Sequence, residues 1–262
     1  MDIIRSIDAR LKSRQLTHFS GTRWGKNLHK LKGAYAGKRC FIIGNGPSLT
    51  AADLDQLLNE YTFAFNRIYY IFDQTSWRPT FYCTQDAKIA KASAADIQAN
   101  IKTPYLFAPI NLKWYEGVAL ESEYFFCPKQ AGDAVPVFSE DIPNFIGTGN
   151  TVAYTAIQLA AYMGFSELYL LGVDHSFRTY QDKDGNIITD PNAKDYFCDQ
   201  YNQDKDQLFV PRLDVSTLSY LAAQEYAQSH PVKIYNATRG GKLEVFPRVD
   251  FDSLFPTKHS EG

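Results

Sequence analysis

The sequence predicts an α/β protein whose core is a doubly wound, mainly parallel sheet with one irregular lid segment. From Lys38 onwards, short apolar runs alternate with helical segments, as they do in βαβ units. These runs are rich in Ile, Phe, Tyr, Val and Leu, and they end in polar, glycine-containing turns, as buried strands do. The predicted strands are Cys40–Ile43, Thr62–Phe65, Thr80–Cys83, Tyr105–Ala108, Glu167–Leu171 and Lys233–Tyr235.

Residues 1–37 precede this alternation and are predicted to form a basic, helical N-terminal arm. We favour a solvated helix that packs on the outside of the core. The alternative is electrostatic contact with an anionic membrane surface or an acidic partner, which would make the protein peripheral to the membrane. The acids of residues 1–39 are Asp2 and Asp8, and the ten basic residues are Arg5, Arg10, Lys12, Arg14, Arg23, Lys26, Lys30, Lys32, Lys38 and Arg39.

Three helices are expected between or after the strands. Thr50-Ala-Ala-Asp53 is typical of a capped helix start and predicts a helix to about Asn59. Residues 151–163 form an apolar helix closed by Gly164, and residues 214–229 have one apolar face.

Residues 113–146 and 178–212 fit the alternation poorly. The second stretch is polar and rich in turns, and a long irregular segment inside a compact domain is usually a functional lid or disordered. Its aromatic residues favour a lid that orders over a ligand, within one domain that spans residues 38–262. These residues are Tyr180, Tyr196, Phe197 and Tyr201.

The composition excludes several classes of protein. The chain has 262 residues, enough for one large α/β domain, and its net charge of −2 argues against a nucleic-acid binder. The four cysteines have no CxxC spacing, so they fit neither a zinc ribbon nor a disulfide scaffold. No apolar run is long enough to span a membrane, and charges interrupt the N-terminal runs that a signal peptide would need. We therefore expect a cytoplasmic protein with reduced thiols.

The residues that follow the predicted strands should form one polar site. Because the carboxyl ends of parallel strands meet at one edge of a sheet, their turns converge there. Five polar turns follow predicted strands: residues 44–48 (GNGPS), Asn66-Arg67, Thr84-Gln-Asp86, residues 172–175 (GVDH) and residues 236–241 (NATRGG). A sixth, residues 147–151 (GTGNT), precedes a helix.

The turn at residues 44–48 could cradle a phosphate with its backbone amides, although a strand-to-helix turn needs glycines in any case. It is neither a GxGxxG motif nor a Walker A loop. A nicotinamide-binding unit would place an acid after the second strand, where this chain has Asn66-Arg67. That pair favours an amide contact and a cation near phosphates or an acidic substrate.

Two further patterns have both a functional and a structural interpretation. Residues 147–151 could bind an anion at a helix N-terminus, or could supply an ordinary N-cap through Asn150 or Thr148. Asp174-His175 could provide a general base or a leaving-group stabiliser, or simply a hydrogen-bonded loop histidine. Residues 182–185 (DKDG) resemble the Asp-x-Asp that holds a metal in sugar-nucleotide enzymes, but Asp-Gly favours a hairpin turn, which we prefer.

Six blocks of the sequence stand out: FIIGNGPSL, FNRIYYIF, RPTFYCTQD, GTGNTVAYTAIQLAAYMGF, YLLGVDHSF and IYNATRGGKLEVFPRVDFDSLF. Together they resemble a bacterial and archaeal family described as 6-hydroxymethylpterin diphosphokinase-like. The resemblance runs in order from about Lys38 to Phe255. More distantly, the blocks are similar to small bacterial sialyltransferases that use CMP-sialic acid. The resemblance implies a Rossmann-like nucleotide-binding domain with a lid at about 178–212 and no metal. It also implies a place in surface-glycan biosynthesis.

Carried onto this chain, the resemblance implies that Asn45, Gly46 and Ser48 face the nucleotide phosphate or ribose. Asn66 would contact the nucleotide or donor sugar. In the same way, Thr148 and Gly149 would hold the cytidine, with Asp174 beside it. The sialyltransferases carry a catalytic histidine just before the helix at 214–229, where this chain has none. A base would then have to be His175 or Asp86.

Three functions remain open. The first is a metal-independent glycosyltransferase that uses a CMP-activated acidic sugar, sialic acid- or Kdo-like, and a glycan, lipid-linked or protein acceptor, with Arg67 meeting the donor's charge. The second is Mg²⁺-dependent diphosphate transfer from ATP to a pterin-like alcohol, with the metal on Asp86 or Asp174. The third is a non-catalytic nucleotide-binding module.

The favoured hypothesis needs no cofactor and no metal ligand. The catalytic candidates are His175, Asp174 and Asp86. The candidate nucleotide-binding residues are Gly44, Asn45, Gly46, Pro47, Ser48, Asn66, Arg67, Thr84, Gly147, Thr148, Gly149, Asn150, Thr151 and Asn236.

Overall fold

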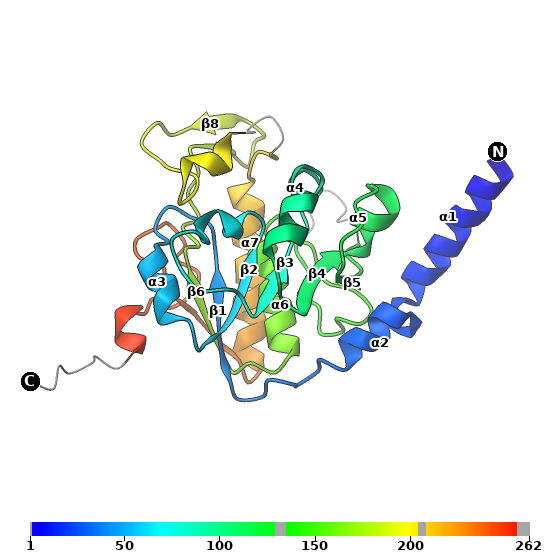
Figure 1. The fold of residues 1–262 in the computed structure, drawn as a ribbon, viewed down its shortest axis with the longest axis horizontal. Helices are drawn as coiled ribbons and strands as arrows, with labels where there is room; N and C mark the ends of the chain where they lie inside the picture. Colours follow the sequence, from blue (N-terminus) through cyan, green and yellow to red (C-terminus); the bar gives the residue numbers. More distant parts are fainter. Residues whose placement is uncertain (1, 129–134, 204–207, 256–262) are drawn as a thin grey trace, which may run out of the picture.

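A seven-stranded parallel sheet with the order β5-β4-β3-β2-β1-β6-β9 forms the centre of the computed structural model (Figure 1). The structure describes residues 2–128, 135–203 and 208–255. The α/β class and the parallel sheet are confirmed, and all six predicted strands are present with bounds within one residue of the prediction. The strands are β1 Arg39–Ile43, β2 Tyr61–Phe65, β3 Phe81–Cys83, β4 Tyr105–Pro109, β5 Glu123–Phe125, β6 Glu167–Leu171 and β9 Lys233–Asn236.

The short edge strand β5 was not predicted. It lies in the stretch that fitted the alternation poorly, and three residues are too few for a periodic pattern. The side chains of Tyr124 and Phe125 are nevertheless buried, because helix α2 (Arg23–His29) packs against this strand.

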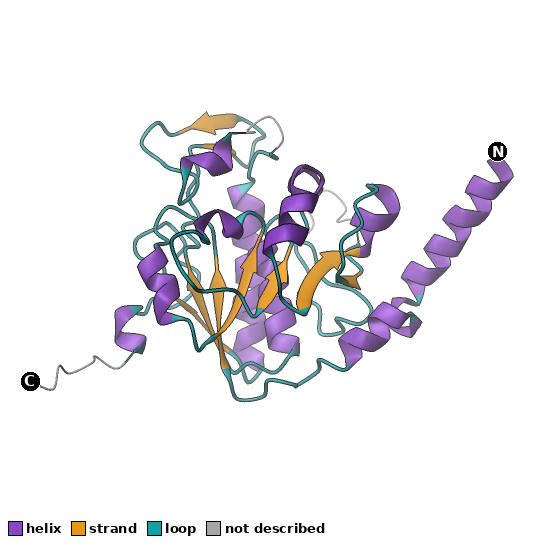
Figure 2. Cartoon of the chain, in the orientation of Figure 1, coloured by secondary structure: helices purple, strands orange, loops and turns teal. Residues whose placement is uncertain are grey.

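The helices cover both faces of the sheet, with α3 and α4 on the near side in Figure 2 and α6 and α7 behind. Helix α6 is the most buried of these, because its apolar residues pack against β1, β2 and β3. The helices named here are α3 Ala51–Gln56, α4 Ala87–Asn100, α5 Ile110–Tyr115, α6 Val152–Tyr162 and α7 Leu213–Ser229.

Helix α3 begins as its sequence predicts. The Thr50 hydroxyl accepts a hydrogen bond from the Asp53 amide, and the Asp53 carboxylate accepts one from the Thr50 amide. This capping box satisfies two amides that would otherwise lack partners. The helix ends at Gln56, before the predicted Asn59.

The basic arm is helical, as predicted, but only part of it packs on the core. Helix α1 (Asp2–Thr17) projects away from the body of the molecule in Figure 1. Helix α2 is anchored by Trp24, whose ring makes edge contacts with Trp114 and Tyr124. No helix among the described residues is long and apolar enough to cross a membrane.

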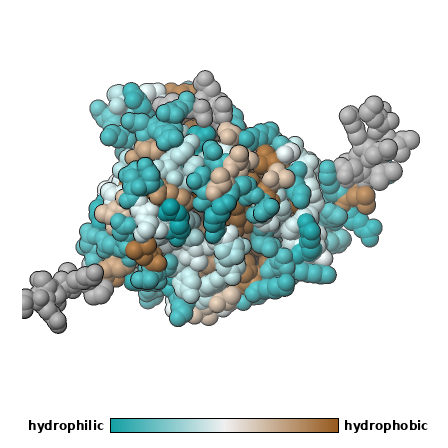
Figure 3. Space-filling model, viewed as in Figure 1, coloured by the Kyte–Doolittle hydropathy of each residue, from teal (hydrophilic) through white to brown (hydrophobic). Residues whose placement is uncertain are grey.

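The segment at 178–212 is irregular apart from a small antiparallel hairpin, β7 (Thr179–Gln181) and β8 (Ile187–Thr189), and the short 3-10 helix η3 (Asp199–Asn202). The Asp182 carboxylate accepts hydrogen bonds from the amides of Asp184 and Asn186 at the hairpin tip. The turn interpretation of residues 182–185 is therefore confirmed. In Figure 3 the surface of this segment, at the top of the view, is mainly hydrophilic.

The order in which the chain adds strands to the sheet reverses between β1 and β6. Strands β2 to β5 lie on one side of β1, and β6 and β9 lie on the other. Just beyond the paired strands, the backbones of the two following turns touch. The Gly44 amide donates to the Leu171 carbonyl at 2.7 Å, and the Gly46 amide donates to the Gly172 carbonyl at 2.8 Å. A Cβ atom on Gly44 would collide with the Gly172 carbonyl oxygen, so only glycine permits this approach.

We expect Gly44→Ala to lower the free energy of unfolding by about 2 kcal/mol or more, because the added methyl overpacks a backbone contact that cannot move without separating two strands. Urea unfolding followed by circular dichroism measures this. Gly21→Ala is the matched control, since a Cβ at Gly21 meets nothing within 4 Å. Equal stability of the two variants would contradict the role given to this contact.

Candidate active site

A cavity of about 670 Å³ lies at the carboxyl edge of the sheet, beside the turns that follow β1, β2 and β6. The segment at 178–212 contributes part of its wall through Tyr196 and Tyr201. The structure brings ten of the predicted site residues to the lining: Gly44, Asn45, Gly46, Asn66, Asp86, Thr148, Asn150, Thr151, Asp174 and His175.

Asn45 lines this cavity and has a side-chain acceptor without a hydrogen-bond partner. Its side-chain amide nitrogen donates to the Phe65 carbonyl at 3.0 Å, which fixes the orientation of the side chain. The opposite atom, Oδ1, is buried without a hydrogen-bond partner, and the residue is only 8% exposed. A buried acceptor left in this state is costly, so it favours a ligand that brings a hydroxyl or amine.

The positive backbone φ angles among non-glycine residues of the described chain are 53° at Asn66, 51° at Asn150 and 51° at His175. All three residues line the cavity. Left-handed backbone is unfavourable for residues with a side chain, least so for asparagine, and such strain clusters at binding and catalytic sites. The left-handed backbone therefore makes the cavity a candidate functional site independently of its shape.

Helix α6 begins at the cavity without a side-chain cap. Its N-cap residue is Thr151, whose hydroxyl caps no amide, and no acid lies in the first turn. The N-cap residue is therefore Thr151, and not Asn150 or Thr148 as in the alternative structural interpretation. Val152 and Ala153 line the cavity at the positive end of the helix dipole. Uncapped amides at a positive helix end favour an anionic ligand group.

His175 is held in one orientation at the cavity wall. Its Nε2 lies 2.8 Å from the Thr217 hydroxyl, which in turn donates to the Leu213 carbonyl at 2.8 Å. The tautomer in which Nε2 carries the ring proton and donates to Thr217 is compatible with that hydroxyl bond, and it leaves Nδ1 as the proton acceptor. Burial lowers the pKa of His175 to about 4, so the imidazole is neutral at pH 7.

Asp86 and Asp174 both line the cavity, and burial raises the pKa of each carboxyl above its ordinary value. The Asp86 carboxylate caps helix α4 by accepting from the amides of Lys88 and Ile89. The Asp174 carboxylate accepts from the Ser48 hydroxyl at 2.7 Å. Ser48 itself does not line the cavity, so it supports Asp174 from behind.

Arg67 needs a correction. Its side chain is 1% exposed, and the guanidinium donates to the Ser93 hydroxyl at 3.1 Å and to the Tyr201 carbonyl at 3.0 Å. Arg67 is absent from the cavity wall, so it does not meet a donor's charge directly as expected. It instead connects the end of β2 to the segment at 178–212, which is called the lid below after its predicted role.

The lid is docked on the sheet through its aromatic residues. Tyr201 is buried and its ring stacks on Tyr196, with ring centroids 3.7 Å apart. The Phe197 amide donates to the Asn45 carbonyl at 3.0 Å. The lid therefore contacts the same turn that carries the unused acceptor of Asn45.

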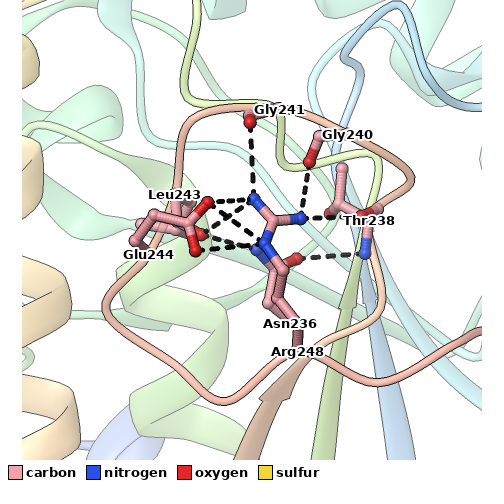
Figure 4. A network of polar contacts seen from close by, with 7 residues as sticks. All are labelled: Asn236, Thr238, Gly240, Gly241, Leu243, Glu244 and Arg248. Carbon is pink, nitrogen blue, oxygen red and sulfur yellow. Dashed lines mark hydrogen bonds and ion pairs between the residues drawn. The ribbon is translucent and has the colours of Figure 1, made fainter.

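Asn236 also differs from its predicted role. It is buried, and its side chain donates to the Leu243 carbonyl and accepts from the Thr238 amide. Beside it, the Arg248 guanidinium bonds the Glu244 carboxylate and the carbonyls of Thr238, Gly240 and Gly241, which clamps the loop (Figure 4). This clamped loop reaches the site, because the Lys242 amide donates to the Asp174 carbonyl at 2.7 Å. Asn236 thus positions the backbone of Asp174 and does not touch the cavity.

The other predicted residues outside the lining also support it. The Thr84 hydroxyl donates to Asn66 Oδ1 at 3.3 Å, Gly147 is bonded by the Gln158 side chain, and the Gly149 carbonyl accepts from the Ser219 hydroxyl at 2.7 Å. Pro47 lies in the turn after β1 without reaching the lining.

Several charged lining residues were missed from the sequence. Glu116 follows helix α5, Asp195 lies in the lid, and Arg212 directly precedes α7. None follows a strand, and no sequence pattern around them indicates a position at the edge of the sheet. With Asp86 and Asp174, they give the described lining four carboxylates and one guanidinium.

Comparisons with known proteins agree with this fold. Residues 13–179 match the family described as 6-hydroxymethylpterin diphosphokinase MptE-like. The chain is similar to the MAf glycosyltransferase of Magnetospirillum magneticum AMB-1, with a TM-score of 0.51 and 16% identity over 89% of this chain, and it spans 39% of that protein. No curated protein matches the sequence.

A second solved structure is the sialyltransferase CstII of Campylobacter jejuni in complex with cytidine-5'-monophosphate. The TM-score is 0.47 and the identity 15%, over 82% of this chain and 85% of that one. At 16% identity, the likeness to the MAf glycosyltransferase concerns the fold alone.

His175 predicts a pH-dependent stability. Its folded-state pKa of about 4 lies below the ordinary value of 6.5, so below pH 6.5 the unfolded chain takes up the proton first. The contribution of the neutral ring is fully present above pH 6.5 and is lost as the pH falls towards 4. Between pH 7 and 4.5, the wild type should lose roughly 2 kcal/mol more unfolding free energy than His175→Asn.

Asparagine is the substitute because it tolerates the left-handed backbone at this position. His29→Asn, an exposed site on α2, is the control and should follow the wild type. Parallel pH profiles for wild type and His175→Asn would show that the ring is not held neutral by burial.

Proposed function

This chain belongs to the 6-hydroxymethylpterin diphosphokinase MptE-like family, and from that premise we propose that it is a transferase acting on a nucleotide-activated donor. The reaction that the site supports best is metal-independent transfer of an acidic sugar from a CMP-linked donor. The acceptor would be a glycan or a lipid-linked sugar. The fold shared with a known glycosyltransferase is compatible with this proposal.

The observation that carries the proposal is the oriented imidazole of His175, which lines the same cavity as the uncapped start of α6. Glycosyl transfer needs a group that accepts the proton of the attacking hydroxyl. It also needs hydrogen-bond donors that stabilise the negative charge developing on the leaving phosphate. His175 Nδ1 serves the first need. The amides of Val152 and Ala153 serve the second.

The remaining groups of the site suit a nucleoside. The free Oδ1 of Asn45 accepts a hydrogen bond from a ribose hydroxyl or a base amine. The rings of Phe177 and Tyr196 line the cavity and offer apolar faces to a base. A lid that closes over the bound donor would exclude water, which matters because hydrolysis of the donor competes with transfer.

In the proposed step, one bond forms and one breaks at the anomeric carbon of the sugar. The acceptor oxygen forms a bond with the anomeric carbon of the sugar while the bond from that carbon to the phosphate oxygen breaks. The acceptor proton passes to Nδ1 of His175. CMP leaves with the bonding electron pair on its phosphate, where the α6 amides stabilise the negative charge.

A second candidate function is supported by the four carboxylates of the lining. Diphosphate transfer from ATP to a pterin-like alcohol needs Mg²⁺ to neutralise the phosphates, and carboxylate oxygens are its preferred protein ligands. Asp86 and Asp174 are the pair that would hold the metal. The family name favours this candidate, whereas the oriented neutral histidine favours glycosyl transfer.

Nucleotide binding separates the two candidates. We expect millimolar CMP or CDP to raise the melting temperature by several degrees in EDTA, because a ligand that binds only the folded state stabilises it. A panel of CMP, CDP, UDP, GDP and ATP with and without Mg²⁺ gives the measurement. A shift seen only with ATP and Mg²⁺ would support the diphosphokinase instead. No shift with any nucleotide would contradict both.

Loss of the proposed base should slow the chemistry without loss of binding. We expect His175→Asn to reduce turnover of CMP-sialic acid, measured as CMP release, by roughly 100-fold, which is the usual contribution of a general base. The CMP-induced melting shift should persist in the variant. His29→Asn is the control for histidine removal. Unchanged turnover in His175→Asn would eliminate the imidazole as the base.

A further inference from the structure

Arg212 is the one Lys or Arg that lines the cavity, within the part of the chain that the structure describes. Four carboxylates, those of Asp86, Glu116, Asp174 and Asp195, share that lining. A phosphate entering such a site meets a repulsive field unless a cation compensates it. Arg67, which the sequence suggested for this task, is buried against the lid and unavailable.

Arg212 lines the same cavity as the start of α6. It is the N-cap residue of α7, and its carbonyl accepts from the Ser216 amide at 3.0 Å. Helix α7 lies against the turn that precedes α6, because the Ser219 hydroxyl donates to the Gly149 carbonyl at 2.7 Å. The guanidinium and the uncapped α6 amides therefore belong to neighbouring walls of one cavity.

The guanidinium is also held in place. Its Nε and Nη2 atoms donate to the two carboxylate oxygens of Asp214 at 3.3 and 2.7 Å. This pairing lowers the pKa of Asp214. Arg212 has a further interaction besides this pair, and its side chain lines the cavity and is 30% exposed. A planar guanidinium fixed in this way matches the geometry of a phosphate better than an ammonium does.

The lid reaches the same residue. The Gln181 amide of β7 donates to the Pro211 carbonyl at 2.9 Å, and Gln181 pairs with Arg212 in a parallel bridge. Arg212 therefore lies at the joint between the lid and α7. Its backbone is fixed from both sides.

We propose that Arg212 is the residue that recognises the phosphate of the bound nucleotide, together with the α6 amides, and so makes the site select nucleotides over nucleosides. The inference rests on the proposed nucleotide binding. It assigns the phosphate contact to a residue outside the turns that follow the strands. Lysine at this position would keep the charge but lose the rigid, planar arrangement of N–H donors that stays in place while Asp214 is bound.

The test compares phosphate-bearing ligands with their parent nucleosides. Calorimetry in EDTA would measure the Kd of CMP and cytidine, and of AMP and adenosine, for the full chain. Arg212→Gln should weaken the better-binding nucleotide roughly tenfold or more, as expected for a charge-assisted hydrogen bond, and leave its nucleoside unchanged within twofold. Arg212→Lys should fall between the wild type and Arg212→Gln.

Lys183→Gln is the matched control, because it removes one positive charge from the exposed hairpin of the same lid. It should leave both affinities unchanged. Melting curves without ligand show that each variant is folded.

The other outcomes are separable. Equal weakening of nucleotide and nucleoside by Arg212→Gln would overturn the phosphate assignment while leaving nucleotide binding intact. Unchanged CMP affinity with weakened CMP-sialic acid would overturn it too and would assign Arg212 to the sugar carboxylate. No binding of any nucleotide to the wild type would contradict both this inference and the proposed function.

Discussion

The site depends on the backbone contact between the turns that follow β1 and β6. The amides of Gly44 and Gly46 bond the carbonyls of Leu171 and Gly172, and side chains at the two glycines would separate the turns. Because the strand order reverses between β1 and β6, the two turns diverge beyond the contact and leave room for a ligand. The contact fixes Asn45 on one side of the cavity, and Asp174 and His175 on the other.

Supporting residues around this contact hold each site group in a defined orientation. The loop clamped by Arg248 holds the backbone of Asp174, Ser48 holds its carboxylate, and Thr217 orients His175. Arg67 connects the end of β2 to the lid. The strain of left-handed backbone at His175 is tolerated because these contacts determine its place. The arrangement is preorganised, which is what electrostatic stabilisation of a transition state requires.

Much of this architecture could be predicted from the sequence, and the exceptions have physical causes. Strand ends were found to within a residue because apolar runs and glycine turns are local signals. The buried position of Arg67 could not be predicted, because its hydrogen-bond partners Ser93 and Tyr201 come from distant segments of the chain. Arg212 lies in the irregular lid, where no periodicity indicates which side chains face the cavity.

The central claim is that the uncapped α6 N-terminus binds a nucleotide phosphate without metal. Backbone amide NMR shifts of Val152 and Ala153 on addition of CMP in EDTA test it most directly. A hydrogen bond from either amide to phosphate predicts a large downfield shift in these resonances, and a smaller one when cytidine replaces CMP. Binding of CMP that leaves both amides unchanged, or that requires Mg²⁺, would contradict the claim.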